Sequence, residues 1–227
     1  GIRCAQLYAT ADLGLLAYES LMPDGSVNEG MIVDEGLAEP WLVGRASVIE
    51  RRIEKYGLRL QRGRDFELIN IDDDPRYRDF WQTYHRLTER KGVTEQLAKI
   101  DMRRRLSLIG TMLLHKGDVD GLICGTWSTP PVHLQYVDQV IGHRLGVNTY
   151  ACMNGLLLPD RQVFLVDTHI NYDPSAEQLA EITVMAAEEM KRFGVEPKAA
   201  LLSHSNFGSS NHPTALKMRR TLSLVQQ

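Results

Sequence analysis

Residues 41–71 read WLVGRASVIERRIEKYGLRLQRGRDFELINI, and this stretch decides the fold class. Trp41–Gly44 is a short apolar run, as is typical of a buried strand. Residues 46–56 follow with apolar side chains at helical spacing, and Gly57 stands where a helix C-cap belongs. Residues 66–71 then predict a second strand. A strand, a helix and a strand in this order indicate an α/β fold with a mainly parallel sheet.

The same alternation continues along the rest of the chain. Thr94 and Pro213 each stand at the predicted start of a helix, as an N-cap and as a first-turn proline. We predict helices over residues 12–21, 77–87, 94–117, 133–141, 176–193 and from 213 onward, and strands over 119–124, 148–158, 162–169 and 198–203. The two strands around residue 160 would add an antiparallel hairpin. We expect two α/β lobes, residues 1–155 with an atypical start over 1–31, and residues 156–227.

Composition places the chain among ordinary globular proteins. Its 227 residues have a formal charge of -3, with 24% charged and 43% hydrophobic residues, which excludes a disordered class. The near-neutral charge favours no nucleic acid partner, and no apolar run is long enough to span a membrane. Because the start lacks a signal-like apolar stretch, we expect a cytoplasmic location. Cys124 and Cys152 lie in apolar runs without a CxxC pair, so we expect buried, reduced thiols.

Two predicted strands end in unusually small, polar residues. Gly125-Thr126-Trp127-Ser128-Thr129-Pro130 follows the first, and Ser203-His204-Ser205-Asn206-Phe207-Gly208-Ser209-Ser210 begins at the end of the second. Ligands of open α/β sheets bind at the carboxyl ends of strands, and free N–H groups and hydroxyls at a helix start form an anion site. The two loops therefore favour a phosphate or pyrophosphate ligand, although loops of this composition also occur without one.

Competing motifs are absent or have simpler explanations. The sequence contains no GxGxxG, GxxxxGK[ST] or GxSxG motif. Its seven histidines show no metal-ligand spacing with Cys, Asp or Glu, so we expect no metal site. The acidic run 72–74 before Pro75 suits the start of a helix better than a cation. Residues 167–169 end a predicted strand, and they either face the ligand site or hydrogen-bond to a neighbouring loop.

At these loops the sequence resembles a known family. Residues 117–125, GDVDGLICG, resemble the GEADALxxG segment of phosphate acetyl/butyryltransferases. Residues 201–210, LLSHSNFGSS, followed by Lys217-Met218-Arg219, resemble the version of this domain at the C-terminus of NADP-dependent malic enzymes. Residues 73–81 and 171–174 fit the same subgroup. The resemblance covers about residues 33–227.

The resemblance implies a two-lobed phosphotransacetylase-like fold, which is also isocitrate/isopropylmalate dehydrogenase-like. In the acyltransferases an acyl phosphate and coenzyme A meet in the cleft between the lobes. The family's catalytic Ser-Arg pair and nearby Asp belong to a segment that would follow Gln227, so we expect a truncated second lobe and assign no catalytic residue. Carried over by position, the cleft would be lined by Gly125, Thr126, Ser128, Thr129, Ser203, Ser205 and Gly208.

Three hypotheses follow from the loops and the resemblance. In the first, the chain is a regulatory and oligomerisation module of a malic enzyme, with acetyl-CoA or an acyl phosphate as its ligand. The parent enzyme would convert malate to pyruvate and CO2, and its NADP and divalent metal would bind outside this chain, which needs no cofactor of its own. In the second, the chain is a fragment of a free-standing phosphate acetyltransferase. In the third, it is a homo-oligomerisation domain without a ligand.

Overall fold

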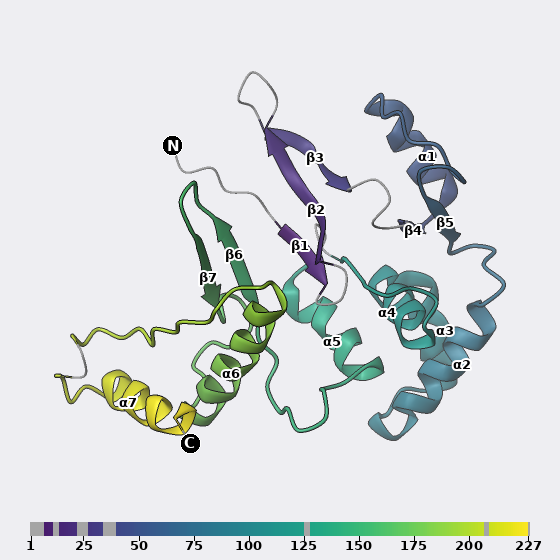
Figure 1. The fold of residues 1–227 in the computed structure, drawn as a ribbon. Helices are drawn as coiled ribbons and strands as arrows, with labels where there is room; N and C mark the ends of the chain where they lie inside the picture. Colours follow the sequence, from purple (N-terminus) through teal and green to yellow (C-terminus); the bar gives the residue numbers. More distant parts are fainter. Residues whose placement is uncertain are drawn as a thin grey trace. The chain divides into compact units, whose positions relative to one another are not determined.

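A computed structural model shows helices packed beside short sheets (Figure 1). The chain forms two compact units, residues 35–142 and residues 1–34 with 143–227. The division into lobes 1–155 and 156–227 stays a prediction. The structure describes residues 7–10, 14–21, 27–33, 40–124, 128–206 and 209–226, the first three ranges by their backbone.

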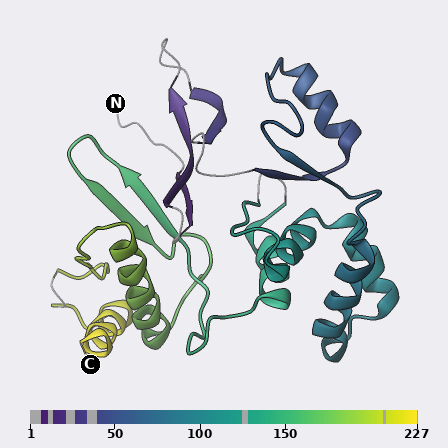
Figure 2. The same cartoon turned by 45° about the vertical axis from the view of Figure 1, so that its right-hand side comes forward.

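The predicted strand, helix and strand are present in the unit 35–142. β4 (Trp41–Gly44) and β5 (Glu67–Asn70) pair in parallel, and α1 (Ala46–Lys55) connects them (Figure 2). Gly57 follows α1 with a φ of 61°, in the left-handed region that suits a glycine. The second strand is one residue shorter at each end than predicted.

A helical layer carries most of the core of this unit. It consists of α2 (Tyr77–Thr88), the 3-10 turn η1 (Glu89–Lys91), α3 (Glu95–Arg104), α4 (Leu106–Lys116) and α5 (Pro130–Val140). The apolar side chains of α2 differ in burial, since Phe80 and Tyr84 are buried whereas Leu87 is exposed. The buried cluster contains Ile69, Phe80, Tyr84, Ala98, Met102, Leu108, Ile109, Met112, Leu113, Tyr136 and Val140.

The prediction of a single helix over 94–117 is wrong. Thr94 does cap its start, because its hydroxyl accepts a hydrogen bond from the Leu97 N–H at 3.2 Å. The helix ends at Arg104, Arg105 is extended with φ -111° and ψ 93°, and α4 begins at Leu106. After this break, α4 buries Leu108, Ile109, Met112 and Leu113 in the core of the unit.

The strands predicted at 119–124 and 198–203 are not formed, because neither described segment takes part in a strand ladder. Leu122 instead packs against α4, where a Cβ on Gly110 would meet its Cδ1 atom at 2.5 Å. Among the named strands of the described residues, β4 with β5 is the one parallel pair. The α/β class is confirmed, but with a small parallel sheet in place of a mainly parallel one.

The described residues of the other unit form two antiparallel sheets and two helices. The helix predicted over 12–21 is wrong, because Gly14–Leu21 forms β2, which pairs with β1 (Leu7–Thr10) and β3 (Val27–Val33). The predicted hairpin is confirmed as β6 (Met153–Leu157) and β7 (Gln162–Val166). α6 (Ala176–Arg192) and α7 (Pro213–Val225) pack together near the hairpin in both views. No described helix is both long and apolar enough to cross a bilayer.

Candidate functional site

The first predicted ligand loop ends at the start of α5. Ser128 has a φ of 71°, which is strained for a residue other than glycine. Thr129 is extended at the N-cap position and makes no side-chain capping bond, while Pro130 opens the helix. Both Ser128 and Thr129 are exposed, so their hydroxyls can reach a ligand. Gly125 and Thr126, the other two predicted residues, lie outside the described residues.

The second loop is organised by its own serines. The Ser205 N–H donates to Ser203 Oγ at 3.1 Å, and the Ser210 N–H donates to Ser205 Oγ at 3.0 Å. Each hydroxyl therefore accepts a backbone hydrogen bond and retains its own proton for donation to another group. Gly208 lies outside the described residues.

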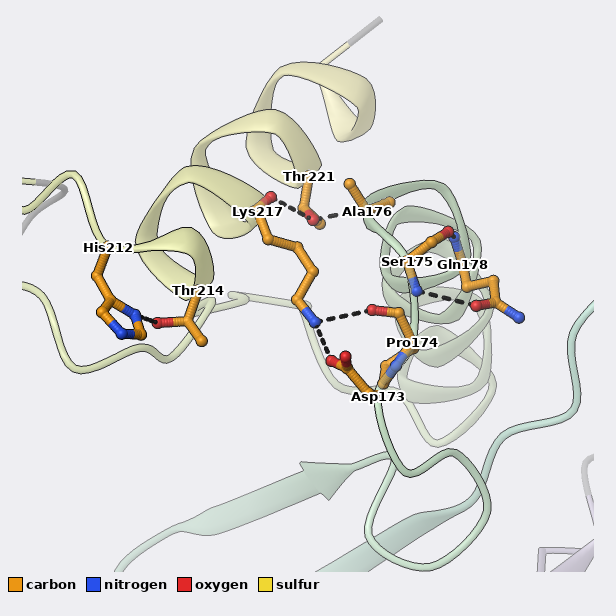
Figure 3. A network of polar contacts seen from close by, with 9 residues as sticks. All are labelled: Asp173, Pro174, Ser175, Ala176, Gln178, His212, Thr214, Lys217 and Thr221. Carbon is orange, nitrogen blue, oxygen red and sulfur yellow. Dashed lines mark hydrogen bonds and ion pairs between the residues drawn. The ribbon is translucent and has the colours of Figure 1, made fainter.

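The second loop leads into α7, which is held against the start of α6 by polar contacts (Figure 3). Lys217 Nζ donates to the Pro174 carbonyl at 3.0 Å and forms an ion pair with Asp173. Thr221 Oγ1 donates to the Ala176 carbonyl at 3.4 Å. The start of α6 carries a capping box, in which Ser175 and Gln178 each bond the other's backbone N–H. These contacts fix the direction in which α7 presents its N-terminal end.

The two loops belong to different compact units. Ser128 and Thr129 lie in residues 35–142, whereas Ser203 and Ser205 lie with residues 143–227. The structure thus brings the predicted residues together in two pairs, and a single cleft lined by both pairs stays a prediction.

The acidic run 72–74 is held by local hydrogen bonds, although none of its side chains caps α2. Asp74 accepts hydrogen bonds from the Arg76 N–H at 2.9 Å and from its guanidinium, which suits the predicted structural role. Burial acts to raise the pKa of Asp74, but the Arg76 bonds outweigh it and the pKa is lowered. Among the described residues, no group of three or more His, Cys, Asp or Glu could hold a metal ion.

Residues 167–169 form hydrogen bonds with neighbouring residues, which is one of the two alternatives that the sequence offered for them. Asp167, with a φ of 58°, accepts from Asn171 Nδ2 at 2.8 Å. Thr168 donates to Asn154, and the His169 N–H donates to Cys152 Sγ at 3.1 Å. These bonds hold the end of β7 against the start of β6.

A polar cluster beside the first loop was missed by sequence reasoning. Ser107 Oγ lies 2.6 Å from His133 Nδ1, although the residues are 26 positions apart and no motif joins them. The expectation of buried thiols is wrong, since Cys124 is exposed and Cys152 is half-buried. Partial burial of the sulfur raises the pKa of the Cys124 thiol, and a hydrogen bond with Ser107 opposes that rise.

The fold and the two loops define an α/β protein with polar loops that lead into helices, and comparison with known proteins supplies the family. The profile described as phosphate acetyl/butaryl transferase matches residues 28–227. The chain therefore belongs to this family.

The relatives fall into two groups. The chain is 48% identical over 196 residues to the NADP-dependent malic enzyme of Salmonella typhimurium, covering 86% of this chain and 26% of that protein. It is 31% identical over 196 residues to the phosphate acetyltransferase of Synechocystis sp., covering 86% of this chain and 28% of that one. The chain thus spans about a quarter of the length of these relatives.

Solved structures agree on the fold. The phosphotransacetylase from Streptococcus pyogenes superposes with a TM-score of 0.73 at 26% identity, covering 85% of this chain and 57% of that one. The EutD phosphotransacetylase from Staphylococcus aureus gives a TM-score of 0.70 at 25% identity, covering 83% and 56%. A phosphotransacetylase-like fold is thus confirmed.

Proposed function

We propose that the chain is an acetyl-CoA-binding regulatory and oligomerisation module of an NADP-dependent malic enzyme. The observation that carries the proposal is the difference in identity between the two groups of relatives, 48% for a malic enzyme against 31% for a phosphate acetyltransferase. The parent reaction would be the oxidative decarboxylation of malate to pyruvate and CO2 in the cytoplasm. Its NADP and divalent metal would be held by parts of the parent enzyme outside residues 1–227.

The chemistry of the two loops supports a phosphate-containing ligand. Ser128 and Thr129 precede α5 with exposed hydroxyls, and Ser203 and Ser205 keep protons to donate. The dipoles of α5 and α7 place partial positive charge at their N-terminal ends, which favours an anion, although Pro130, Pro131 and Pro213 have no N–H to donate there. Coenzyme A carries a pyrophosphate and a further phosphate, which these hydroxyl donors would bind. The role proposed for these side chains is binding, and no bond-making step is assigned to them.

Titration of the 227-residue chain with acetyl-CoA by calorimetry tests the proposal. A hydrogen bond to a charged group contributes about 1.5–3 kcal/mol, so the double variant Ser128→Ala, Ser203→Ala should raise the Kd at least about tenfold. Ser47→Ala in α1 and Ser223→Ala in α7 are matched controls, because both serines are exposed and helical. Equal affinity of the double variant and the native chain would remove these loops from the binding site.

Two further assays separate the other hypotheses. Transfer of acetyl from acetyl phosphate to coenzyme A at enzyme-like rates would identify an acyltransferase instead. Light scattering after gel filtration would report the homo-oligomer. An oligomer that binds no acetyl-CoA would leave the ligand-free oligomerisation domain.

A further inference from the structure

The Ser107–His133 pair joins α4 to α5, the helix that follows the first ligand loop. Ser107 lies in the first turn of α4, and His133 lies in the first turn of α5. Their side chains approach to 2.6 Å and are partly buried. A contact this short, between helices separated by the whole segment 117–129, fixes the start of α5 relative to α4.

The chain before the loop also contacts α4. One turn beyond Ser107, Leu122 lies over Gly110, where a Cβ would come within 2.5 Å of it. Leu122 therefore holds the chain before the loop on α4, and Ser107 holds the helix that follows the loop.

The loop conformation requires such support. Ser128 has a φ of 71°, which a serine adopts at a cost in free energy. Strained residues of this kind persist where the surrounding structure holds them. On either side of Ser128, Leu122 and His133 contact α4, Leu122 by packing on Gly110 and His133 by its bond to Ser107.

We propose that Ser107 is a positioning residue, whose hydroxyl ties the start of α5 to α4 through His133 and so fixes Ser128 and Thr129, which directly precede α5, for contact with a ligand. The part of this inference that concerns the ligand rests on the proposed function, whereas the tie itself does not. Without the hydroxyl, the start of α5 loses this anchor, and Ser128 relaxes from its strained conformation.

The experiment compares Ser107→Ala with Ser107→Thr, which keeps a hydroxyl, and with Ser47→Ala, a control in the first turn of α1. Amide hydrogen exchange of the ligand-free chain is measured in peptides that contain Ser128 and the first turn of α5. Loss of a hydrogen bond of ordinary strength should speed exchange about fivefold there in Ser107→Ala, with peptides from α2 unchanged. Ser107→Thr should restore slow exchange. Exchange in Ser107→Ala equal to that of the native chain overturns the proposal.

A second pair of variants approaches the tie from the other helix. His133→Asn keeps a polar atom near the position of Nδ1, whereas His133→Ala removes it, so only His133→Ala should reproduce the faster exchange. Acetyl-CoA titration of the same proteins separates the two proposals. Faster exchange in Ser107→Ala with no acetyl-CoA binding by the native chain would support the tie and refute the proposed function. Unchanged exchange with normal binding would refute the tie alone.

Discussion

Replacing Gly110 by Ala should push Leu122 off α4, and the size of the effect follows from the packing. The added Cβ would lie 2.5 Å from Leu122 Cδ1 and 3.5 Å from Cδ2. Overpacking of this kind costs about 1–3 kcal/mol, while Ala in place of Gly inside a helix contributes about 0.5–1 kcal/mol. The single variant should therefore lower the free energy of unfolding by about 1 kcal/mol.

The same substitution should have the opposite sign once Leu122 is shortened. In a Leu122→Ala background the Cδ1 methyl group that clashes is gone, and only the helix-propensity gain of about 0.5–1 kcal/mol remains. Urea unfolding of the four proteins of this cycle, followed by circular dichroism, gives the coupling free energy. We expect a coupling of about 1–3 kcal/mol, because the two side chains touch.

A coupling near zero would refute the packing of Leu122 on α4. Gly92→Ala is a matched control, since nothing lies within 4 Å of its Cβ position and its cost comes from a φ of 90°. Its effect should be the same with Leu122 and with Ala at position 122. Dependence on residue 122 in the control would mean that the cycle reports a general loosening of the unit.

Further predictions concern single hydrogen bonds and titrations. Tyr84→Phe removes the bond to Gln139 at 2.8 Å and should lower the free energy of unfolding by about 1 kcal/mol. Burial, helped by the Asp101 charge, raises the pKa of Tyr84 to about 12. In an ultraviolet titration of this variant, the phenol that ionises at the highest pH should therefore be missing. Ser175→Ala removes the capping box of α6 and should cost about 1 kcal/mol in urea unfolding. In Asp74→Asn, the free energy of unfolding should fall less steeply as the pH is lowered through the acid range.

The sign of the Asp74 effect follows from proton linkage. Its pKa in the folded chain is depressed below the ordinary value of 3.8, so its stabilisation is present above that pH and is lost as pH falls through the depressed value. Tyr84 acts in the opposite sense, because a raised pKa in the folded chain stabilises below about pH 10 and is lost as pH rises toward 12. An unchanged acid limb in Asp74→Asn, or a phenol titration unchanged in Tyr84→Phe, would contradict these assignments.

Local signals gave the elements whose cause is local. Gly57 and Thr94 mark helix ends through backbone conformation and side-chain capping, which depend on a few neighbouring residues. The hairpin over 153–166 is confirmed for the same reason, since its strands are close in sequence. The predictions of strands at 119–124 and 198–203 were wrong, because an apolar run becomes a strand only where another strand supplies hydrogen-bond partners.

The candidate site divides in the same way. Ser128 and Ser203 were found from the polar ends of apolar runs, and the structure places both on loops that lead into helices. Ser107 was not found, because it sits in an apolar helix and its partner lies 26 residues away. No composition or spacing rule connects such a pair.

The sequence by itself determined the strand, helix and strand over residues 41–71, the later hairpin, the helix caps at Gly57 and Thr94 and the family, since each is carried by patterns within short stretches of chain. The tertiary structure alone decided the break at Arg105, the seat of Leu122 on Gly110 and the contact of Ser107 with His133. These features depend on which surfaces meet when the helices pack. Which surfaces meet is decided by the burial of the whole apolar cluster, so it cannot be read from any single residue.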